Sequence, residues 1–281
     1  MNVFLPLFIR WDVDPVLFSI GSIEIRYYGL FWVIALGVSA LLCHNFMKRE
    51  GFSEKKFDSI FWFGVLGTII GARLGHCLFY DPGYYLSHPL EILNLRQGGL
   101  ASHGAAIGLL VGLWLFSRKN RIPYIWSLDR IGMAAALGGA AVRLGNLMNS
   151  EIYGDVTPLP WGFVFVRAGE TQPMHPTQLY EALAYLAIFF LLWWMYYKKG
   201  VAFRRPGVMF GLFLILLFGI RFLIEFVKLP QEAFEENMAL DMGQLLSIPF
   251  VIAGGAILWR ALRRPPRELT KIEVPLVKKK K

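Results

Sequence analysis

Residues 207–227 read GVMFGLFLILLFGIRFLIEFV, and in this whole stretch only Arg221 and Glu225 are charged. A helix of about 20 mostly apolar residues is long enough to cross the hydrocarbon core of a bilayer. The rest of the chain is similar, because 56% of its 281 residues are hydrophobic and only 17% are charged. This composition predicts an integral membrane protein and excludes an ordinary soluble domain.

Six other stretches meet the same requirement, so we predict an all-α polytopic membrane protein with about seven transmembrane helices. The predicted spans are residues 28–45, 59–80, 99–116, 125–148, 176–197, 207–227 and 242–262. They divide the chain into a small external N-terminal arm (1–27), a membrane domain (28–262) with an external cap loop (149–175), and a cytoplasmic basic tail (263–281).

The loops on one side of the membrane carry most of the positive charge. Lysine and arginine together number four in residues 46–58, three in 117–124, four in 198–206 and nine from Arg260 onward, against five on the other side. The positive-inside rule therefore places the N-terminus outside and the C-terminus in the cytoplasm. The net charge of +9 then belongs to loops that face anionic lipid, and no nucleic acid partner is expected.

The sequence contains none of the common motifs for metal-dependent or serine hydrolase chemistry. Cys43 and Cys77 both lie in apolar stretches, so neither a disulfide framework nor a cysteine metal site is expected. The five histidines lack the spacing of zinc ligands. H-E-x-x-H, G-x-S-x-G and phosphate-binding-loop motifs are absent from the sequence. We therefore expect no metal and no cofactor.

Small residues recur at every fourth position in two of the predicted spans. These are Gly67, Gly71 and Gly75 in the second span, and Gly104, Gly108 and Gly112 in the third. Such spacing lets two helix backbones approach closely in a membrane. Gly138 and Gly139 give the fourth span a small face as well. The three spans are therefore predicted to form a tight central bundle.

Polar residues inside the spans come early in the spans that run inward and late in those that run outward. They are Tyr28, Ser102, His103, His175, Gln178, Tyr180, Glu181 and Gln244 in the former, and Arg73, His76, Arg143, Asn146, Asn149, Arg221 and Glu225 in the latter. Because alternate helices reverse direction, all these residues are expected in the outer half of the membrane. Charged residues at this depth are costly unless paired or facing water, so the cluster is a candidate functional site.

Arginines at one depth, balanced by few carboxylates, indicate a site for an anion. The planar guanidinium groups of Arg143 and Arg221 match phosphate oxygens, and a phospholipid head group is the most available anion at that depth. His103 could accept a proton near neutral pH. Three alternatives remain open: a transporter or proton relay, a non-catalytic assembly or receptor protein, and plain ion pairs with Glu151 or Glu225.

The segment from Arg143 to Gly154 reads RLGNLMNSEIYG and resembles R-x-G-N-x-x-N-x-E-x-x-G, a signature of bacterial phosphatidylglycerol–prolipoprotein diacylglyceryl transferases. Further matches occur in order from the first span to the seventh, so the resemblance covers nearly the whole chain. They are Tyr28-Gly29, Gly98 to Gly104, His175 to Glu181, Arg221 to Glu225, and Met242 to Pro249. Leu217 departs from the pattern, because some members have a tyrosine one turn before the arginine.

The resemblance implies an enzyme of the bacterial cytoplasmic (inner) membrane, with its active site toward the outer leaflet, that performs the first step of lipoprotein maturation. Such an enzyme transfers the diacylglyceryl group of phosphatidylglycerol to the lipobox cysteine thiol of exported prolipoproteins. The products are a thioether and glycerol 1-phosphate. The implied partners are therefore phosphatidylglycerol, prolipoproteins and the lipid bilayer.

The resemblance also implies roles for particular residues. His103, Arg143 and Arg221 are expected to be catalytic, with His103 as the candidate base and the arginines on the phosphate. The residues expected to bind the phospholipid are Arg143, Arg221, Tyr28, Asn146, Glu151, Glu225, Arg73, His175 and Gln178.

Overall fold

The computed structural model describes residues 8–21, 23–94, 99, 101–229 and 238–267 of the chain. The chain divides into two compact units, which we call the first unit (1–42 with 129–269) and the second unit (43–128 with 270–281). Parts of the sequence-based predictions lie outside the described residues: positions 1–7 and 22 of the arm, positions 98 and 100 of the matched motif, and positions 268–281 of the basic tail.

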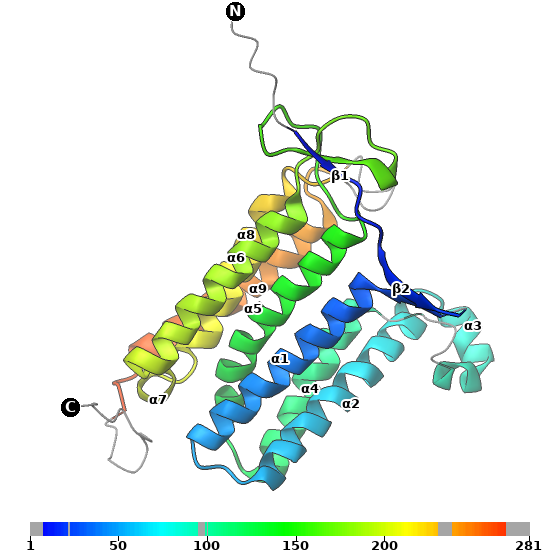
Figure 1. Ribbon diagram of the computed structural model, residues 1–281. Helices are drawn as coiled ribbons and strands as arrows, with labels where there is room; N and C mark the ends of the chain where they lie inside the picture. The colour runs from blue at the N-terminus through cyan, green and yellow to red at the C-terminus, as the bar shows by residue number, and fades with distance from the viewer. Residues whose placement is uncertain (1–7, 22, 95–98, 100, 230–237, 268–281) are drawn as a thin grey trace, which may run out of the picture. The chain divides into compact units, whose positions relative to one another are not determined.

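Helices occupy all seven predicted ranges. They are α1 (Tyr27–Arg49), α2 (Glu54–Phe79), α4 (Ser102–Asn120), α5 (Tyr124–Met148), α6 (Thr177–Trp194), α8 (Val208–Glu225) and α9 (Met242–Arg263) (Figure 1). Within the described ranges, six helices are long and apolar enough to cross a membrane, and α4 is not among them. The polar ends of α4 shorten its apolar stretch. A multi-pass membrane protein is confirmed, and the seventh crossing stays a prediction.

Some helix ends and short elements differ from the prediction. Helix α2 begins at Glu54 rather than Ser59, because its first turn is polar and therefore gives no hydropathy signal. The short elements that the sequence did not predict are α3 (Pro82–Ser87), the 3-10 helices η1 (Pro89–Leu93) and η3 (Val166–Ala168), the π-helical turn η4 (Met195–Lys199) and α7 (Val201–Arg204).

In the first unit, α8 packs against both α6 and α9. Gly211 and Gly254 permit the close approach of α8 and α9, since a Cβ on Gly211 would lie 3.0 Å from the Gly254 carbonyl oxygen. Asp129 of α5 is 1% exposed, and its carboxylate accepts hydrogen bonds from the backbone N–H groups of Gly207 (2.8 Å) and Phe210 (2.9 Å). This carboxylate therefore caps the N-terminus of α8 from a neighbouring helix.

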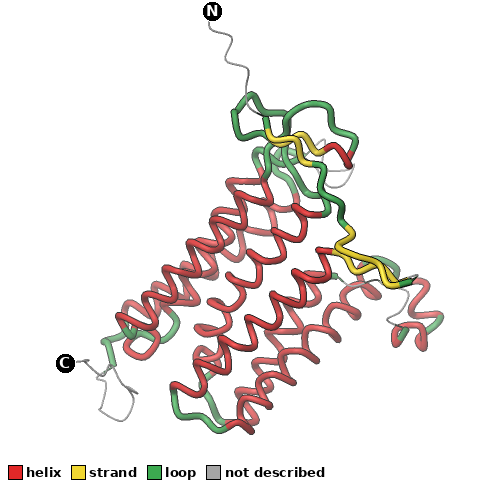
Figure 2. The backbone as a smooth tube through the Cα atoms, in the orientation of Figure 1, coloured by secondary structure: helices red, strands yellow, loops and turns green. Residues whose placement is uncertain are grey.

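The predicted arm and cap loop form ordered structure in the first unit. Strand β1 (Ile9–Trp11) pairs in parallel with β4 (Phe163–Phe165) of the cap loop, and β2 (Val16–Ile20) forms an antiparallel hairpin with β3 (Ile23–Arg26) (Figure 2). Trp11 donates a hydrogen bond to the Leu147 carbonyl at the end of α5 (3.0 Å). Arm and cap share a hydrophobic cluster of Leu147, Phe163, Phe165 and Met174 with Trp11 and neighbouring side chains.

In the second unit, α2 and α4 pack through their glycines. A Cβ on Gly71 would lie 2.6 Å from Gly108 Cα, and a Cβ on Gly75 would lie 2.7 Å from Gly104 Cα. The predicted close approach of these two helices is confirmed.

The glycines of α5 lie against helices of the first unit. A Cβ on Gly138 would lie 3.1 Å from Ser39 Oγ of α1, and one on Gly139 would lie 3.2 Å from the Tyr185 ring of α6. Gly138 and Gly139 therefore face α1 and α6, and the bundle of all three spans stays a prediction. Small residues show that a helix has a close neighbour, but they do not identify which helix it is.

Candidate functional site

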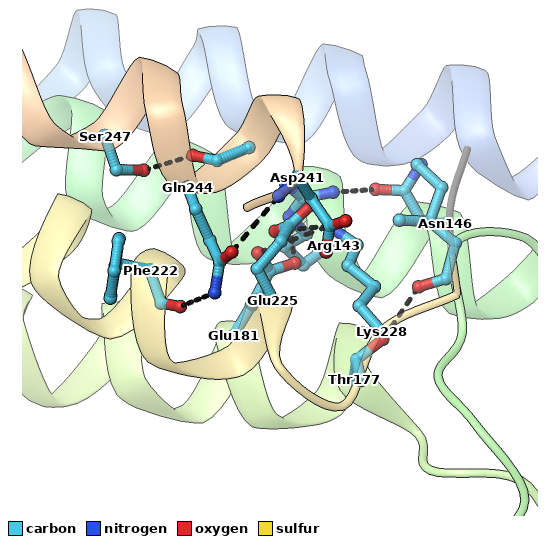
Figure 3. Close-up of polar contacts among 12 residues, drawn as sticks. Arg143, Asn146, Thr177, Glu181, Phe222, Glu225, Lys228, Asp241, Gln244 and Ser247 are labelled. Atoms are coloured by element: carbon cyan, nitrogen blue, oxygen red, sulfur yellow. Dashed lines mark hydrogen bonds and ion pairs between the residues drawn. The ribbon is translucent and has the colours of Figure 1, made fainter. Parts of the chain in front are cut away.

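Charged side chains from α5, α6 and α8 meet in the first unit (Figure 3). Arg143 Nε of α5 lies 2.6 Å from Glu181 Oε2 of α6. Lys228, which follows the end of α8, places Nζ 3.9 Å from Glu181 Oε1 and 3.4 Å from Glu225 Oε2. The side chains of Glu181 and Lys228 are 0% and 1% exposed. We call this set, Arg143–Glu181–Lys228–Glu225, the buried ion-pair network.

Helical spacing places the network's residues on inward faces. Gln178, Glu181 and Tyr185 lie one turn apart along α6, and all three are buried. Arg221 and Glu225 are one turn apart on α8. Each helix therefore presents its few polar groups to the interior of the first unit.

The segment after α5 folds back onto the end of that helix. Arg143 Nη1 donates to Asn146 Oδ1 (3.3 Å), and Asn146 Nδ2 donates to Glu151 Oε1 (2.8 Å). Asn149 Nδ2 also donates to Glu151 Oε1 (3.4 Å), and Gln178 Nε2 donates to the Glu151 backbone carbonyl (2.6 Å). Glu151 therefore binds asparagine amides, whereas Glu181 forms the ion pair with Arg143.

Two residues beside Glu151 have left-handed backbone conformations. Ser150 has φ 53° and Ile152 has φ 61°, and neither is glycine. Such a conformation costs about 1–2 kcal/mol in each residue. The hydrogen bonds that hold the Glu151 side chain and carbonyl offset this cost, as expected at a functional segment.

Arg221 belongs to the same cluster as Arg143. Tyr185 and Lys228 each interact electrostatically with both guanidinium groups. Arg221 Nε is buried and has no hydrogen-bond partner among the described residues. With Lys228, the cluster holds three cations and the two carboxylates of Glu181 and Glu225. This positive excess suits an anion.

Burial lowers the pKa of the Lys228 amine below its ordinary value. The positive charges of Arg143 and Arg221 lower it as well, whereas Glu181 and Glu225 act in the opposite direction. The amine is therefore easier to deprotonate than an exposed lysine.

The N-terminus of α9 closes one side of the network. A Cβ on Gly243 would lie 2.7 Å from Glu225 Oε2, so this glycine leaves room for the carboxylate in its observed position. Asp241 and Gln244 form a capping box at the start of the helix. Gln244 Nε2 also donates to the Phe222 carbonyl of α8 (3.4 Å), which fixes α9 against the turn that contains Glu225.

Tyr28 and His175 flank the network from other elements of the first unit. Tyr28 of α1 packs against Gly145 of α5, the residue before Asn146. A Cβ on Gly145 would lie 3.1 Å from Tyr28 Cδ2. His175 Nδ1 lies 3.2 Å from the Tyr180 hydroxyl, which accepts a hydrogen bond from Trp161 Nε1 (2.9 Å). Tyr180 thus links the His175 ring to Trp161, and both of these residues belong to the cap loop.

Arg73 and His103 lie in the second unit. Arg73 is 3% exposed and donates to the backbone carbonyls of Ile92 (2.8 Å), Glu91 (2.6 Å) and Gly99 (3.2 Å). His103 is exposed in the first turn of α4. The Arg73 guanidinium therefore donates hydrogen bonds to backbone carbonyls, whereas the His103 side chain is exposed.

Sequence reasoning placed Glu181 in the polar cluster and in a matched motif but gave it no role, and it missed Lys228 as a member of the site. Lys228 was one of the five lysines and arginines counted outside the spans on the less basic side, because it follows the apolar stretch. Spacing held a signal in both cases, since Glu181 follows Gln178 by three residues and Lys228 follows Glu225 by three.

Comparison with known proteins agrees with the resemblance. A family model described as prolipoprotein diacylglyceryl transferase matches residues 15–260. A protein of Porphyromonas gingivalis named phosphatidylglycerol–prolipoprotein diacylglyceryl transferase is 46% identical over 275 residues, covering 93% of this chain and 97% of that protein. Proteins of the same name from Bacteroides fragilis (46% identity; 88% and 93% covered) and Chloroherpeton thalassium (41%; 94% and 98%) are also similar.

Proposed function

Because this chain belongs to the prolipoprotein diacylglyceryl transferase family, we propose that Arg143 and Arg221 hold the phosphate of phosphatidylglycerol during diacylglyceryl transfer. The chain is a transferase of lipoprotein biosynthesis, with phosphatidylglycerol and prolipoproteins as its substrates. Neither the family nor the relatives support the alternative of a transporter or proton relay. The observation that carries the phosphate assignment is the shared, positively charged cluster around a buried Arg221 Nε.

In the proposed reaction, the thiolate of the lipobox cysteine attacks the terminal glycerol carbon of the diacylglyceryl group. A carbon–sulfur bond forms, the bond from that carbon to the phosphate oxygen breaks, and the oxygen keeps the electron pair. Glycerol 1-phosphate leaves. Negative charge therefore grows on a phosphate oxygen, and donors aimed at such a charge can each contribute about 3 kcal/mol to the rate.

The two arginines are suited to this task in different ways. A guanidinium has five N–H donors. In Arg143, the ion pair with Glu181 and the hydrogen bonds with Asn146 and Tyr185 orient the group. Arg221 keeps Nε unpaired among the described residues. The proposal therefore assigns both groups to phosphate oxygens, with Tyr28, Glu151, Glu225, His175 and Gln178 lining the phospholipid site around them.

His103 is proposed as the base that takes the thiol proton. A cysteine thiol has an ordinary pKa of about 8.5, so a neutral imidazole can help to form the thiolate near pH 7. The exposure of His103 at the start of α4 supports access to a substrate. Arg73 stays in the proposed phospholipid site, with the backbone carbonyls of Ile92, Glu91 and Gly99 holding its guanidinium in place.

The protein is proposed to lie in the bacterial cytoplasmic (inner) membrane with a fixed orientation. Seven helices cross it, the arm and cap loop lie outside, the basic tail is cytoplasmic, and the active site faces the outer leaflet. The distribution of lysine and arginine among the loops supports this arrangement. Single cysteines in the cap loop should then react with an impermeant thiol reagent in intact cells whose outer membrane has been permeabilised. Labelling only after lysis would contradict the orientation.

The phosphate assignment can be tested with purified protein in phosphatidylglycerol vesicles and a lipobox peptide. We expect Arg143→Ala and Arg221→Ala each to lower kcat/KM at least ~100-fold, and His103→Gln to slow turnover strongly. Arg167→Ala is the matched control, because Arg167 is 44% exposed in the cap loop and pairs with Asp12. Normal glycerol 1-phosphate release by both arginine variants would refute the assignment.

A further inference from the structure

Lys228 lies where the signature segment, α6 and α8 meet. Its backbone forms a β-bridge with Gly154, the last residue of the matched signature, and Val227 accepts a hydrogen bond from the Asp155 N–H (3.0 Å). Its Nζ reaches carboxylates from two different helices, Glu181 and Glu225 (Figure 3). The main chain therefore fixes the position from which this ammonium enters the buried ion-pair network.

The net charge of the cluster, which consists of the buried ion-pair network and Arg221, depends on this one ammonium. Without it, the carboxylates of Glu181 and Glu225 would balance the guanidinium groups of Arg143 and Arg221, and no positive excess would remain. With Lys228, these five side chains carry one excess positive charge, while the neighbouring Glu151 carboxylate is bound by the amides of Asn146 and Asn149. Burial of an uncompensated charge costs free energy. The binding of a phosphate in this region is therefore favoured by an excess of positive charge.

We propose that Lys228 is a positioning residue that neutralises Glu181 and Glu225, so that Arg143 and Arg221 keep their charge for the lipid phosphate. This inference rests on the proposed phosphate site. Lys228 touches the carboxylates and acts on the substrate through them. Its contribution is therefore electrostatic, and removal of one neighbouring negative charge should replace it.

The test uses Lys228→Met, Lys228→Arg and the double variant Lys228→Met/Glu225→Gln, each in phosphatidylglycerol vesicles with a lipobox peptide. Lys228→Met should lower kcat/KM about 100-fold, as expected when one partner of a buried charge pair is lost. The double variant should recover at least about tenfold of this loss, because the positive excess returns. Lys228→Arg should stay within about threefold of the native protein, since arginine keeps the charge.

Lys198→Met is the matched control, because Lys198 is exposed near the end of α6, and its activity should be unchanged. Native activity in Lys228→Met would overturn the inference, as would a double variant no better than Lys228→Met. If Lys228→Met does not fold, the inference requires both Lys228→Arg and the double variant to be active. Arg143→Ala separates the two proposals. If Arg143→Ala keeps its activity, the phosphate site itself is refuted. If Arg143→Ala loses its activity but Lys228→Met keeps it, only the role of Lys228 is refuted.

Discussion

Glu181→Gln removes the central negative charge of the buried ion-pair network and keeps the size of the side chain. Glu181 is 0% exposed, 2.6 Å from Arg143 Nε and 3.9 Å from Lys228 Nζ. The nearer contact dominates, because Coulomb energy falls with distance. Removing one partner of a buried ion pair costs about 3–5 kcal/mol, since the other charge stays buried without compensation. We expect the free energy of unfolding to fall by that amount.

The loss can be measured by titrating detergent-solubilised protein with SDS and following the helical circular dichroism signal. Glu54→Gln is the matched control, because its side chain is 71% exposed and pairs with His44 at 3.1 Å. Such a surface pair contributes about 0–0.5 kcal/mol. If the two variants unfold at the same SDS concentration, Glu181 does not compensate buried cations and the electrostatic reasoning fails.

Three further predictions concern packing, capping and pH. Gly71→Ala should cost about 1–3 kcal/mol in the same SDS titration, because the new methyl group meets the α4 backbone; Gly64→Ala, with its nearest neighbour atom 3.7 Å away, should cost much less. Asp129→Ala should destabilise the protein by about 2 kcal/mol and so lower its thermal unfolding midpoint, since the N–H groups of Gly207 and Phe210 at the start of α8 lose their acceptor. As pH rises through the lowered pKa of Lys228, its ammonium loses the proton and the KM for phosphatidylglycerol should rise; Lys228→Arg should move this alkaline limb to higher pH.

The sequence carried much of the site, because chemistry and helical spacing are both local properties. The segment from Arg143 to Gly154 indicates the family from sequence alone, and its Asn146 and Glu151 are hydrogen-bonded to each other. The partner of Arg143 could not be predicted in the same way. Glu151 and Glu225 were the candidates, yet Glu181 holds the ion pair, because the choice depends on how α5 faces α6.

By itself, the sequence determined that this chain is a membrane protein, which long helices it forms and which family it belongs to. Both the length of each apolar stretch and the family signature can be recognised in consecutive residues of the sequence. Only the tertiary structure decided that Asp129 caps α8, that Gly138 faces α1, and that Lys228 joins two carboxylates from different helices. These contacts depend on the packing of distant segments, and hydropathy and spacing within one segment do not encode which surfaces meet.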